Sequence, residues 1–334
     1  MSQYDLYAIG NALVDTEYEV SDEQLAAMGV AKRHMTLIDA QRKTELLQAV
    51  QGRHSRRTGG GSAANTVVAL SQLGGKGYYA CRVGDDDLGT FYGDDLVANG
   101  VATNLTGAPA TPGQTGSCLV MVTPDAERSM STFLGATADL DASALSQQAI
   151  ASSKIYYMEG YLAASPTGLD AALKGRAIAS QAGVALAATL SDMSMINFCR
   201  AGLDAMVGDG LDYLFANEEE AQTWCGTTDL AAICEQLSKV SRVVCLTRSS
   251  KGSIVVEGSS RTEVAAVPVK ALDTNGAGDM YAGAFLYAVT QGYSNTQAAA
   301  LANLAAAEVV SQYGNRLSLE KIAQVFSRFK AQLA

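Results

Sequence analysis

The second half of the chain alternates short apolar runs with longer segments of helical spacing, and this alternation constrains the fold more than any other feature. Apolar runs with the length of buried strands occupy residues 155–158, 184–190, 213–216 and 243–247. Helical spacing of apolar residues occupies residues 166–181, 195–207, 229–239 and 296–313. Strands buried on both faces and joined by helices are typical of a mainly parallel sheet. The pattern therefore predicts an α/β fold with a doubly wound, mainly parallel sheet.

The first 140 residues follow a different pattern. Residues 115–123 and 128–134 predict two strands joined by a turn, and residues 15–20 and 35–38 can extend them into a small sheet. We expect one domain over residues 1–334, with a β-sheet lid formed from segments at about 12–38 and 107–137. An ordinary β extension that packs for stability or dimerisation fits the composition equally well.

Length and charge narrow the functional classes. A chain of 334 residues can form one large core with a small appendage. The net charge of −10 argues against nucleic acid or an anionic membrane as the main partner, since both require clustered Lys and Arg. The first residues lack the features of a signal peptide, and no apolar run has the length of a membrane span. We expect a cytoplasmic monomer or homodimer with a small-molecule substrate.

The segment Asp273-Thr274-Asn275-Gly276-Ala277-Gly278-Asp279 carries the strongest chemical signal. Glycines permit tight backbone geometry, and the unpaired N–H groups of a first helical turn form an anion site. Phosphoryl transfer needs such donors together with a group that takes the proton of the attacking hydroxyl. Asp279 is placed to be that general base. The alternative is a glycine-rich turn whose aspartates only cap the helix.

A second glycine-rich segment, Gly59-Gly60-Gly61-Ser62-Ala63-Ala64-Asn65, precedes a helical pattern over residues 66–73. Here the backbone can approach a ligand closely, and the Asn65 side chain offers both a donor and an acceptor. By itself this segment is typical of a helix start. This segment becomes evidence for a ligand site only in combination with the Asp279 segment.

The two segments together resemble the signatures of the ribokinase (PfkB carbohydrate kinase) family, and the resemblance covers nearly the whole chain. The sequence is similar to the adenosine kinase branch of this family in several further segments, which are Gly10-Asn11-Ala12-Leu13-Val14-Asp15, Thr115-Gly116-Ser117-Cys118, Gly160-Tyr161-Leu162 and Leu214-Phe215-Ala216-Asn217-Glu218-Glu219-Glu220-Ala221. The resemblance implies a ribokinase-like fold and ATP-dependent phosphorylation of a primary hydroxyl, with the 5′-hydroxyl of adenosine as the favoured acceptor.

The resemblance also implies roles for the catalytic residues. Asp279 would remove the hydroxyl proton, while the backbone N–H groups of Gly276, Ala277 and Gly278 would hold the charge of the transferred phosphoryl group. Arg128, on the expected lid, would close over the phosphates, which its planar donor fork suits.

The acceptor-binding residues follow in the same way. Asn11 and Asp15 match positions that hold sugar hydroxyls in similar enzymes, and Gly60, Gly61 and Asn65 would complete the ribose end. Without the family context, Asp15 would be interpreted as an ordinary turn or strand-end aspartate.

The resemblance implies two cation sites. Asn217 and Glu220 match a motif that acts through water on Mg²⁺ and the phosphates, and Mg²⁺ prefers such sparse oxygen ligation. The same residues are also typical of a capped helix start, and both interpretations can hold together. Asp273 would hold its loop, with a monovalent cation such as K⁺ as a further expectation.

The remaining nucleotide contacts are expected at Thr247, Arg248 and Gly252, which resemble the family's nucleotide loop, and at Asn303, which matches a position near the ATP base. Ser249 departs from the family pattern, because Gly is usual there.

The sequence does not decide which molecule carries the hydroxyl that is phosphorylated. Leu162 stands where adenosine kinases commonly have a second aromatic residue, while Met35 and Phe133 can supply an apolar wall. A sugar kinase acting on ribose, fructose or a related ketose is therefore an alternative, and a non-catalytic nucleoside or sugar sensor is another. A Rossmann dehydrogenase is a poorer option, because no Gly-x-Gly-x-x-Gly follows the first strand, and a P-loop kinase is excluded, because the sequence lacks its Gly-x-x-x-x-Gly-Lys-Ser/Thr motif.

Overall fold

A computed structural model describes residues 2–53, 55–107, 111–125 and 127–333 of the chain. Its main element is a nine-stranded sheet of order β14-β13-β12-β11-β10-β9-β1-β5-β6. The strands are β1 (Tyr4–Ile9), β5 (Gly77–Ala80), β6 (Ala102–Thr103), β9 (Ser153–Glu159), β10 (Ala185–Thr189), β11 (Leu211–Asn217), β12 (Ser241–Thr247), β13 (Ser253–Glu257) and β14 (Ser260–Val264). All neighbours from β12 to β6 pair in parallel, and β13 and β14 add an antiparallel edge. The predicted mainly parallel sheet is confirmed.

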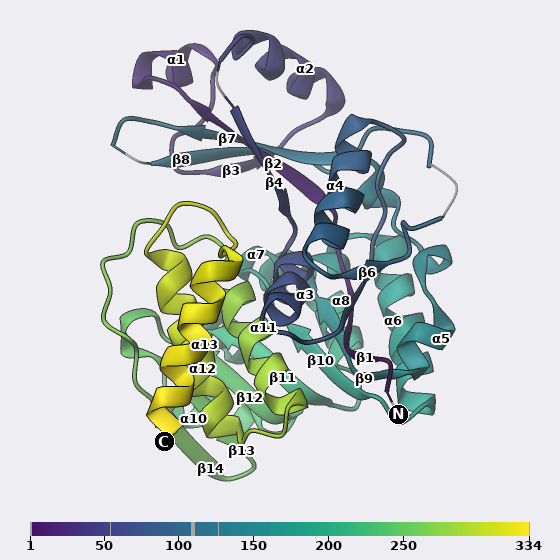
Figure 1. The fold of residues 1–334 in the computed structure, drawn as a ribbon, viewed down its shortest axis with the longest axis vertical. Helices are drawn as coiled ribbons and strands as arrows, with labels where there is room; N and C mark the ends of the chain where they lie inside the picture. The colour runs from purple at the N-terminus through teal and green to yellow at the C-terminus, as the bar shows by residue number, and fades with distance from the viewer. Residues whose placement is uncertain (1, 54, 108–110, 126, 334) are drawn as a thin grey trace.

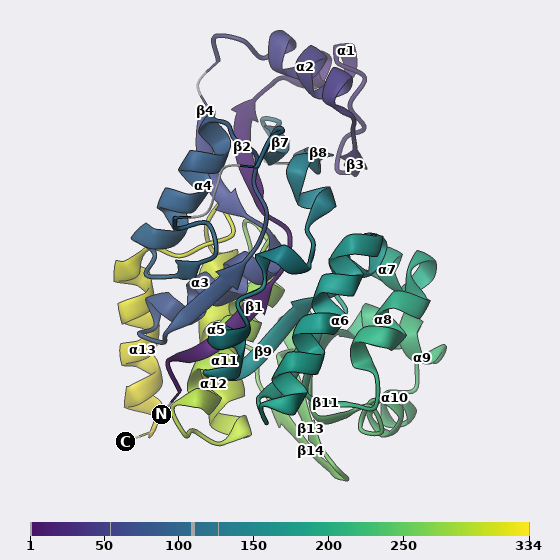
Figure 2. The same ribbon diagram turned by 90° about the vertical axis from the view of Figure 1, so that its right-hand side faces the viewer.

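Helices cover both faces of this sheet, as Figure 2 shows. One face carries α3 (Ser62–Gln72), α4 (Asp87–Ala98), α11 (Ala277–Thr290), α12 (Asn295–Val310) and α13 (Leu319–Leu333). The other carries α5 (Gln147–Ala151), α6 (Pro166–Gln181), α7 (Met193–Phe198), α8 (Arg200–Val207), α9 (Glu218–Cys225) and α10 (Leu230–Leu237). Two separate apolar cores result, one on each face. Short 3₁₀ turns complete the domain at η1 (Gly135–Asp139), η2 (Ala142–Ala144), η3 (Gly160–Ala164) and η4 (Ser249–Lys251).

One predicted helix differs from the structure. The segment 195–207 was expected to be continuous, but α7 ends at Phe198 and α8 begins at Arg200. Cys199 between them has φ −126° and ψ 25°, outside the helical region. Periodicity continues across such a break because each short helix still places apolar residues on the core side.

A second, five-stranded sheet projects from the main domain (Figure 1). Its order is β3-β8-β7-β2-β4, formed by β2 (Leu13–Glu19), β3 (Met35–Leu37), β4 (Ser55–Gly60), β7 (Gly116–Val122) and β8 (Arg128–Phe133). The helices α1 (Asp22–Ala27) and α2 (Ala40–Ala49) cover its outer face, where Leu25 and Leu46 pack with Leu119 and Met121. We call this sheet with its two helices the small domain.

The small domain is larger than the lid expected from sequence. It includes α2 and β4, so its first segment extends to Gly60 rather than to about residue 38. β4 was missed because Ser55, Arg56 and Arg57 are exposed and polar, without the apolar alternation of a half-buried strand. The expected second segment, 107–137, contains residues 108–110 and 126, which lie outside the described residues.

Alternation along β2 directs different side chains to the two faces of the small sheet. Tyr18 packs under α1 and α2, whereas Asp15 and Glu17 point to the other side, where they meet Asn315 and Arg128. The inner face of the small domain therefore presents carboxylates to the main domain. No helix in the described part of the chain is long and apolar enough to cross a membrane.

Ser249 yields a stability prediction. It has a φ of +51°, in the left-handed region that costs an L-residue roughly 1–2 kcal/mol, which explains why Gly is usual there. Glycine itself costs roughly 0.5–1 kcal/mol in chain entropy. We expect Ser249→Gly to raise the free energy of unfolding by about 0.5–1 kcal/mol in chemical denaturation. Ser250→Gly, at a neighbouring position without a positive φ, should lower it; equal effects of the two changes would contradict this explanation.

Candidate active site

The carboxyl ends of four parallel strands bring the predicted site residues to one edge of the main sheet, below the small domain. Asn11 follows β1, Glu159 ends β9, Asn217 ends β11 and Thr247 ends β12. Ligands of doubly wound sheets bind at this edge. The N-terminus of α11, which carries Asp279, lies at the same edge, because Asp279 contacts the start of α3.

Asp279 lies in the first turn of α11 and accepts hydrogen bonds on both carboxylate oxygens. Ser62 Oγ donates to Oδ1 (2.7 Å), and Asn65 Nδ2 donates to Oδ2 (3.0 Å). Burial raises the pKa of Asp279 to about 6, although these two hydrogen bonds and the charge of Arg316 act in the opposite direction. The result is a carboxylate of fixed orientation whose basicity is suited to neutral pH.

The backbone before Asp279 has the geometry of an anion site. Gly276 adopts a left-handed conformation with φ +74°, and a side chain there would collide with Asn315. Within the described part of the chain, the N–H groups of Gly276 and Gly278 have no hydrogen-bond acceptor. The N–H of Ala277, in contrast, donates to the Thr274 carbonyl at 3.3 Å. Two of the three expected donors therefore have no acceptor here, while the third, Ala277, is engaged in a turn; their role at the phosphoryl group stays a prediction.

Glu159 is a site residue that sequence reasoning missed. Its side chain is fully buried, and its two oxygens accept from Asn11 N (2.7 Å), Asn11 Nδ2 (2.7 Å) and Ala63 N (2.8 Å). Burial raises its pKa to about 7. A glutamate at the end of an otherwise apolar strand is the signal that could have identified it. Glu159 fixes both Asn11 and the start of α3.

Asp15 lies where β2 passes the glycine-rich segment. A side chain at Gly60 would collide with its carboxylate, and one at Gly61, where φ is +99°, would collide with the Asn11 carbonyl. Asn315 Nδ2 donates to Asp15 Oδ2 (3.2 Å), and burial raises the pKa of Asp15 to about 7. Asn11, Asp15, Gly60 and Gly61 therefore lie close together, and their binding of an acceptor stays a prediction.

Arg128 joins the small domain to the loop that precedes α11. Its guanidinium pairs with Glu17 (2.7 Å) and with Asp273 (2.9 Å), and it lies over the Tyr313 ring. Asp273 also accepts from Asn275 N (3.1 Å) and Gly314 N (2.9 Å). The loop-holding role expected for Asp273 fits these contacts. The monovalent cation expected there stays a prediction, and in the present arrangement Arg128 is the counterion of this carboxylate.

Asn65 has partners that differ from the expected ribose hydroxyls. Its amide nitrogen donates to Asp279, and its oxygen accepts from Arg316 Nε (2.9 Å). The residue is 5% exposed. Asn65 is therefore held against the carboxylate of Asp279 and is not turned toward open space.

Asn217 and Glu220 form a capping box at the start of α9. Asn217 Nδ2 and N donate to the Glu220 carboxylate (2.7 and 3.0 Å), and Glu220 N donates back to Asn217 Oδ1 (2.8 Å). Burial raises the pKa of Glu220 to about 7, and the charges of Asp192 and Asp279 act in the same direction. The capping interpretation is confirmed, and the carboxylate also belongs to the acidic edge of the sheet.

The expected nucleotide residues surround the turn after β12. Thr247 ends the strand, Arg248 pairs with Glu218 (3.4 Å), and Gly252 has a φ of +88° that brings the chain back to the Arg248 N–H. Asn303 is buried in α12, and its amide donates to the carbonyls of Val264 and Ala265 (3.0 and 3.1 Å). It is thus not a surface residue; it fixes the chain after β14.

A cavity of about 560 Å³ is lined by residues on both sides of Thr137, whose hydroxyl contacts Asn11. None of the predicted acceptor-binding residues is among the described residues that line it. Leu37, Thr132 and Phe133 belong to its lining. Phe133 is thus placed as an apolar wall, while Met35 is half exposed on β3. Leu162 is fully buried in the core, so its departure from an aromatic residue leaves this wall unchanged.

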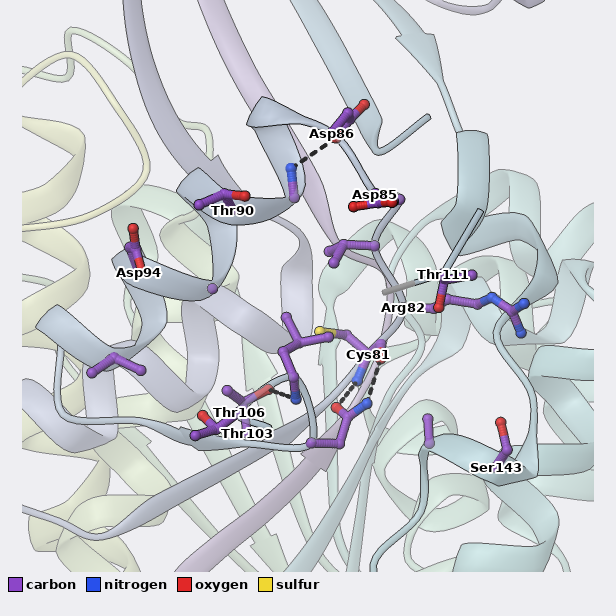
Figure 3. Close-up of a pocket in the computed structure, with 18 of the residues that line it drawn as sticks. Cys81, Arg82, Asp85, Asp86, Thr90, Asp94, Thr103, Thr106, Thr111 and Ser143 are labelled. Carbon is purple, nitrogen blue, oxygen red and sulfur yellow. Dashed lines mark hydrogen bonds between the residues drawn. The ribbon is translucent and has the colours of Figure 1, made fainter. Parts of the chain in front are cut away.

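A further cavity, of about 640 Å³, is shown in Figure 3. It lies between α4 and the chain around Thr103, Thr106 and Ser143, with Arg82 and Asp94 in its lining. Among the described residues that line it, none is a predicted site residue. The site at the sheet edge is therefore separate from this cavity.

Comparison with known proteins agrees with this geometry. A family model described as "pfkB family carbohydrate kinase" matches residues 25–322. The crystal structure of adenosine kinase from Sinorhizobium meliloti is 35% identical, with a TM-score of 0.88 over 98% of this chain and 100% of that one. A probable sugar kinase protein from Rhizobium etli CFN 42 is 34% identical, with a TM-score of 0.88 over the full length of both chains. Adenosine kinase of Schizophyllum commune is 29% identical over 87% of this chain and 90% of its own.

The burial of Glu159 predicts a pH effect on stability. Its pKa is raised in the folded state, so its contribution to stability is full below about pH 4 and is lost as pH rises through about 7. The stability difference between wild type and Glu159→Gln should therefore shrink by about 2 kcal/mol from pH 5 to pH 8. Urea titrations of both proteins at each pH measure this difference. Curves that stay parallel across the range would contradict the raised pKa.

Proposed function

The chain belongs to the pfkB family of carbohydrate kinases, an ATP-using phosphotransferase family with alcohol acceptors, and from this premise we propose that it phosphorylates the 5′-hydroxyl of adenosine. The observation that carries the chemistry is the position of Asp279, three residues after Gly276 and one after Gly278, whose N–H groups have no acceptor in the described part of the chain. Transfer of a phosphoryl group to a hydroxyl requires a base close to an anion site, and these neighbouring residues can supply both.

In the proposed reaction, Asp279 accepts the proton of the 5′-hydroxyl while the hydroxyl oxygen attacks the γ-phosphorus of ATP. The bond from the γ-phosphorus to the bridging oxygen breaks, and ADP leaves with that electron pair. Ser62 and Asn65 hold the carboxylate in place, and its pKa of about 6 keeps it ionised at neutral pH. The amides of Gly276 and Gly278 hold the charge of the phosphoryl oxygens.

Asn11 and Asp15 would bind the ribose hydroxyls, with Gly60 and Gly61 allowing the sugar to approach the backbone. Asn11 is supported by Glu159, and Asp15 is held by Asn315. Arg128 would exchange its Asp273 partner for the phosphates as the small domain closes. Closure would exclude water, which otherwise competes as an acceptor.

Magnesium fits the residues at this edge. In the described residues, no group of three His, Cys, Asp or Glu side chains could hold a metal by itself. Glu220 nevertheless lies within the electrostatic reach of Asp192 and Asp279, an excess of negative charge that a cation would offset. Mg²⁺ favours such sites, since it keeps several waters. We propose that Asn217 and Glu220 hold the hydrated ion, which when bound neutralises phosphate charge.

The two solved structures of similar identity are an adenosine kinase and a probable sugar kinase, so identity alone does not decide between a nucleoside and a sugar as the acceptor. The cavity of about 560 Å³ at the segment of Thr137, whose hydroxyl contacts Asn11, has an apolar wall that includes Leu37 and Phe133. A purine base would use this wall by burying its faces, whereas a free ribose or fructose would leave it unoccupied. This favours adenosine, and a sugar kinase is the second candidate.

We predict that Asp279→Asn lowers kcat about a thousandfold, because it removes the proton acceptor while keeping the shape. In wild type, kcat/KM should rise tenfold per pH unit below about pH 6 and level off above it, since only the ionised carboxylate is a base. An ADP-release assay with adenosine, inosine, guanosine, ribose and fructose measures both effects. Asp170→Asn, exposed on α6, is the matched control. Turnover that survives in Asp279→Asn would refute the assignment of the base, and turnover with a free sugar alone would change the acceptor.

We also predict that Arg128→Ala lowers kcat/KM for ATP roughly 10- to 100-fold, because the phosphates lose a guanidinium in a partly buried site. Arg33→Ala is the control, since Arg33 is an exposed arginine of the small domain that pairs with Glu127. Steady-state kinetics with varied ATP distinguish the two variants. Unchanged kinetics in Arg128→Ala would contradict the proposal that Arg128 binds the phosphates.

A further inference from the structure

Residues 313–316, between α12 and α13, contact four residues of the proposed site. The Tyr313 ring lies under Arg128, Gly314 N donates to Asp273, Asn315 Nδ2 donates to Asp15, and Arg316 Nε donates to Asn65. In Figure 1 this yellow connection lies just below the small domain. None of these residues was singled out from the sequence.

We propose that Arg316 is a positioning residue for the base, which fixes the amide of Asn65 so that its N–H₂ group faces the carboxylate of Asp279. This proposal deepens the proposed function and rests on it. Arg316 itself touches neither reacting atom; it acts through Asn65.

The guanidinium of Arg316 is fixed at both ends. Its Nε donates to Asn65 Oδ1 (2.9 Å), and its Nη1 pairs with Asp95 of α4. The side chain is 11% exposed and lies against Gly59, where any side chain would collide with Arg316 and Asp95. A rigid planar fork between two fixed acceptors leaves the donor no alternative orientation.

This arrangement decides which end of the Asn65 amide faces the base. An amide has a donor end and an acceptor end, and Arg316 can only donate. The acceptor end must therefore turn to Arg316, which leaves Nδ2 to donate to Asp279 Oδ2 (3.0 Å). With the amide reversed, its oxygen would face the carboxylate and Nδ2 would face the guanidinium, and both contacts would be repulsive.

Arg316 also supplies positive charge to an acidic region. Asp279 is faced by Glu159, Tyr157 and Tyr161 from the end of β9 and η3, and by Glu220 from α9. Arg316 is the cation whose charge opposes burial at both Asp279 and Asp15. Removing the charge should therefore make the base harder to ionise.

The alternative is a purely structural ion pair that ties the 313–316 segment to α4 through Asp95. Such a role predicts lower stability but no specific dependence of the kinetic effect on Asn65. Three variants separate the two roles. Arg316→Lys keeps the charge but loses the fork, Arg316→Met loses both, and Arg328→Lys, at an exposed arginine of α13, is the matched control.

The test is a double-mutant cycle in kcat, combined with pH profiles, on the acceptor that wild type accepts. We expect Arg316→Lys to lower kcat roughly 10- to 100-fold with the acidic limb of kcat/KM unchanged. Arg316→Met should also move that limb upward by roughly half a pH unit to one unit. In an Asn65→Ala background, Arg316→Lys should change kcat less than about twofold. Full additivity of the two changes would overturn the proposal.

A readout without turnover keeps this test independent of the proposed function. With ¹³C-labelled aspartate carboxyls, and Asp279→Asn to assign the signal, NMR titration follows Asp279 directly in folded protein. The proposal expects a higher pKa in Arg316→Met than in wild type, and equal values would overturn it. Absence of Asp279-dependent phosphorylation in wild type would refute the proposed function, while the titration would still test whether Arg316 acts on Asp279.

Discussion

The site depends on the burial of carboxylates where parallel strands end and helices begin. Asp15, Glu159, Glu220 and Asp279 all have raised pKa values because they are withdrawn from water, and each accepts at least one hydrogen bond from an N–H group. Unpaired, such groups would cost several kcal/mol each. The start of α3, the start of α9, Asn11 and the 313–316 segment supply these donors, so the backbone geometry of these segments depends on the buried charges that they contact.

The same constraint links the two domains. Asp15, on the small sheet, accepts a hydrogen bond from Asn315 of the main domain. Arg128, also on the small sheet, pairs with Glu17 of the same sheet and with Asp273 of the main domain. Each carboxylate or guanidinium that binds substrate in the proposed function has a protein partner here. Binding would therefore be an exchange of partners, which couples the position of the small domain to ligand occupancy.

The sequence predicted the parallel sheet, the strands 155–158 and 213–216 and the Asp279 segment, because these follow from local apolar patterns and from an ordered motif. It did not predict β4, whose exposed residues carry no alternation. Glu159 and Arg316 were missed for a different reason: their partners Asn11 and Asn65 are 148 and 251 positions away, and such pairing depends on topology. The contacts of Asn65 likewise required the fold.

The central claim is that Asp279 is the base beside an anion site formed by the preceding backbone. The most direct measurement is a crystal structure of the protein with adenosine and a non-hydrolysable ATP analogue. The account predicts an Asp279 carboxylate oxygen at about 2.6–3.2 Å from the acceptor hydroxyl, with the γ-phosphate against the amides of Gly276 and Gly278. An acceptor hydroxyl bound away from Asp279, or a γ-phosphate held elsewhere, would contradict it.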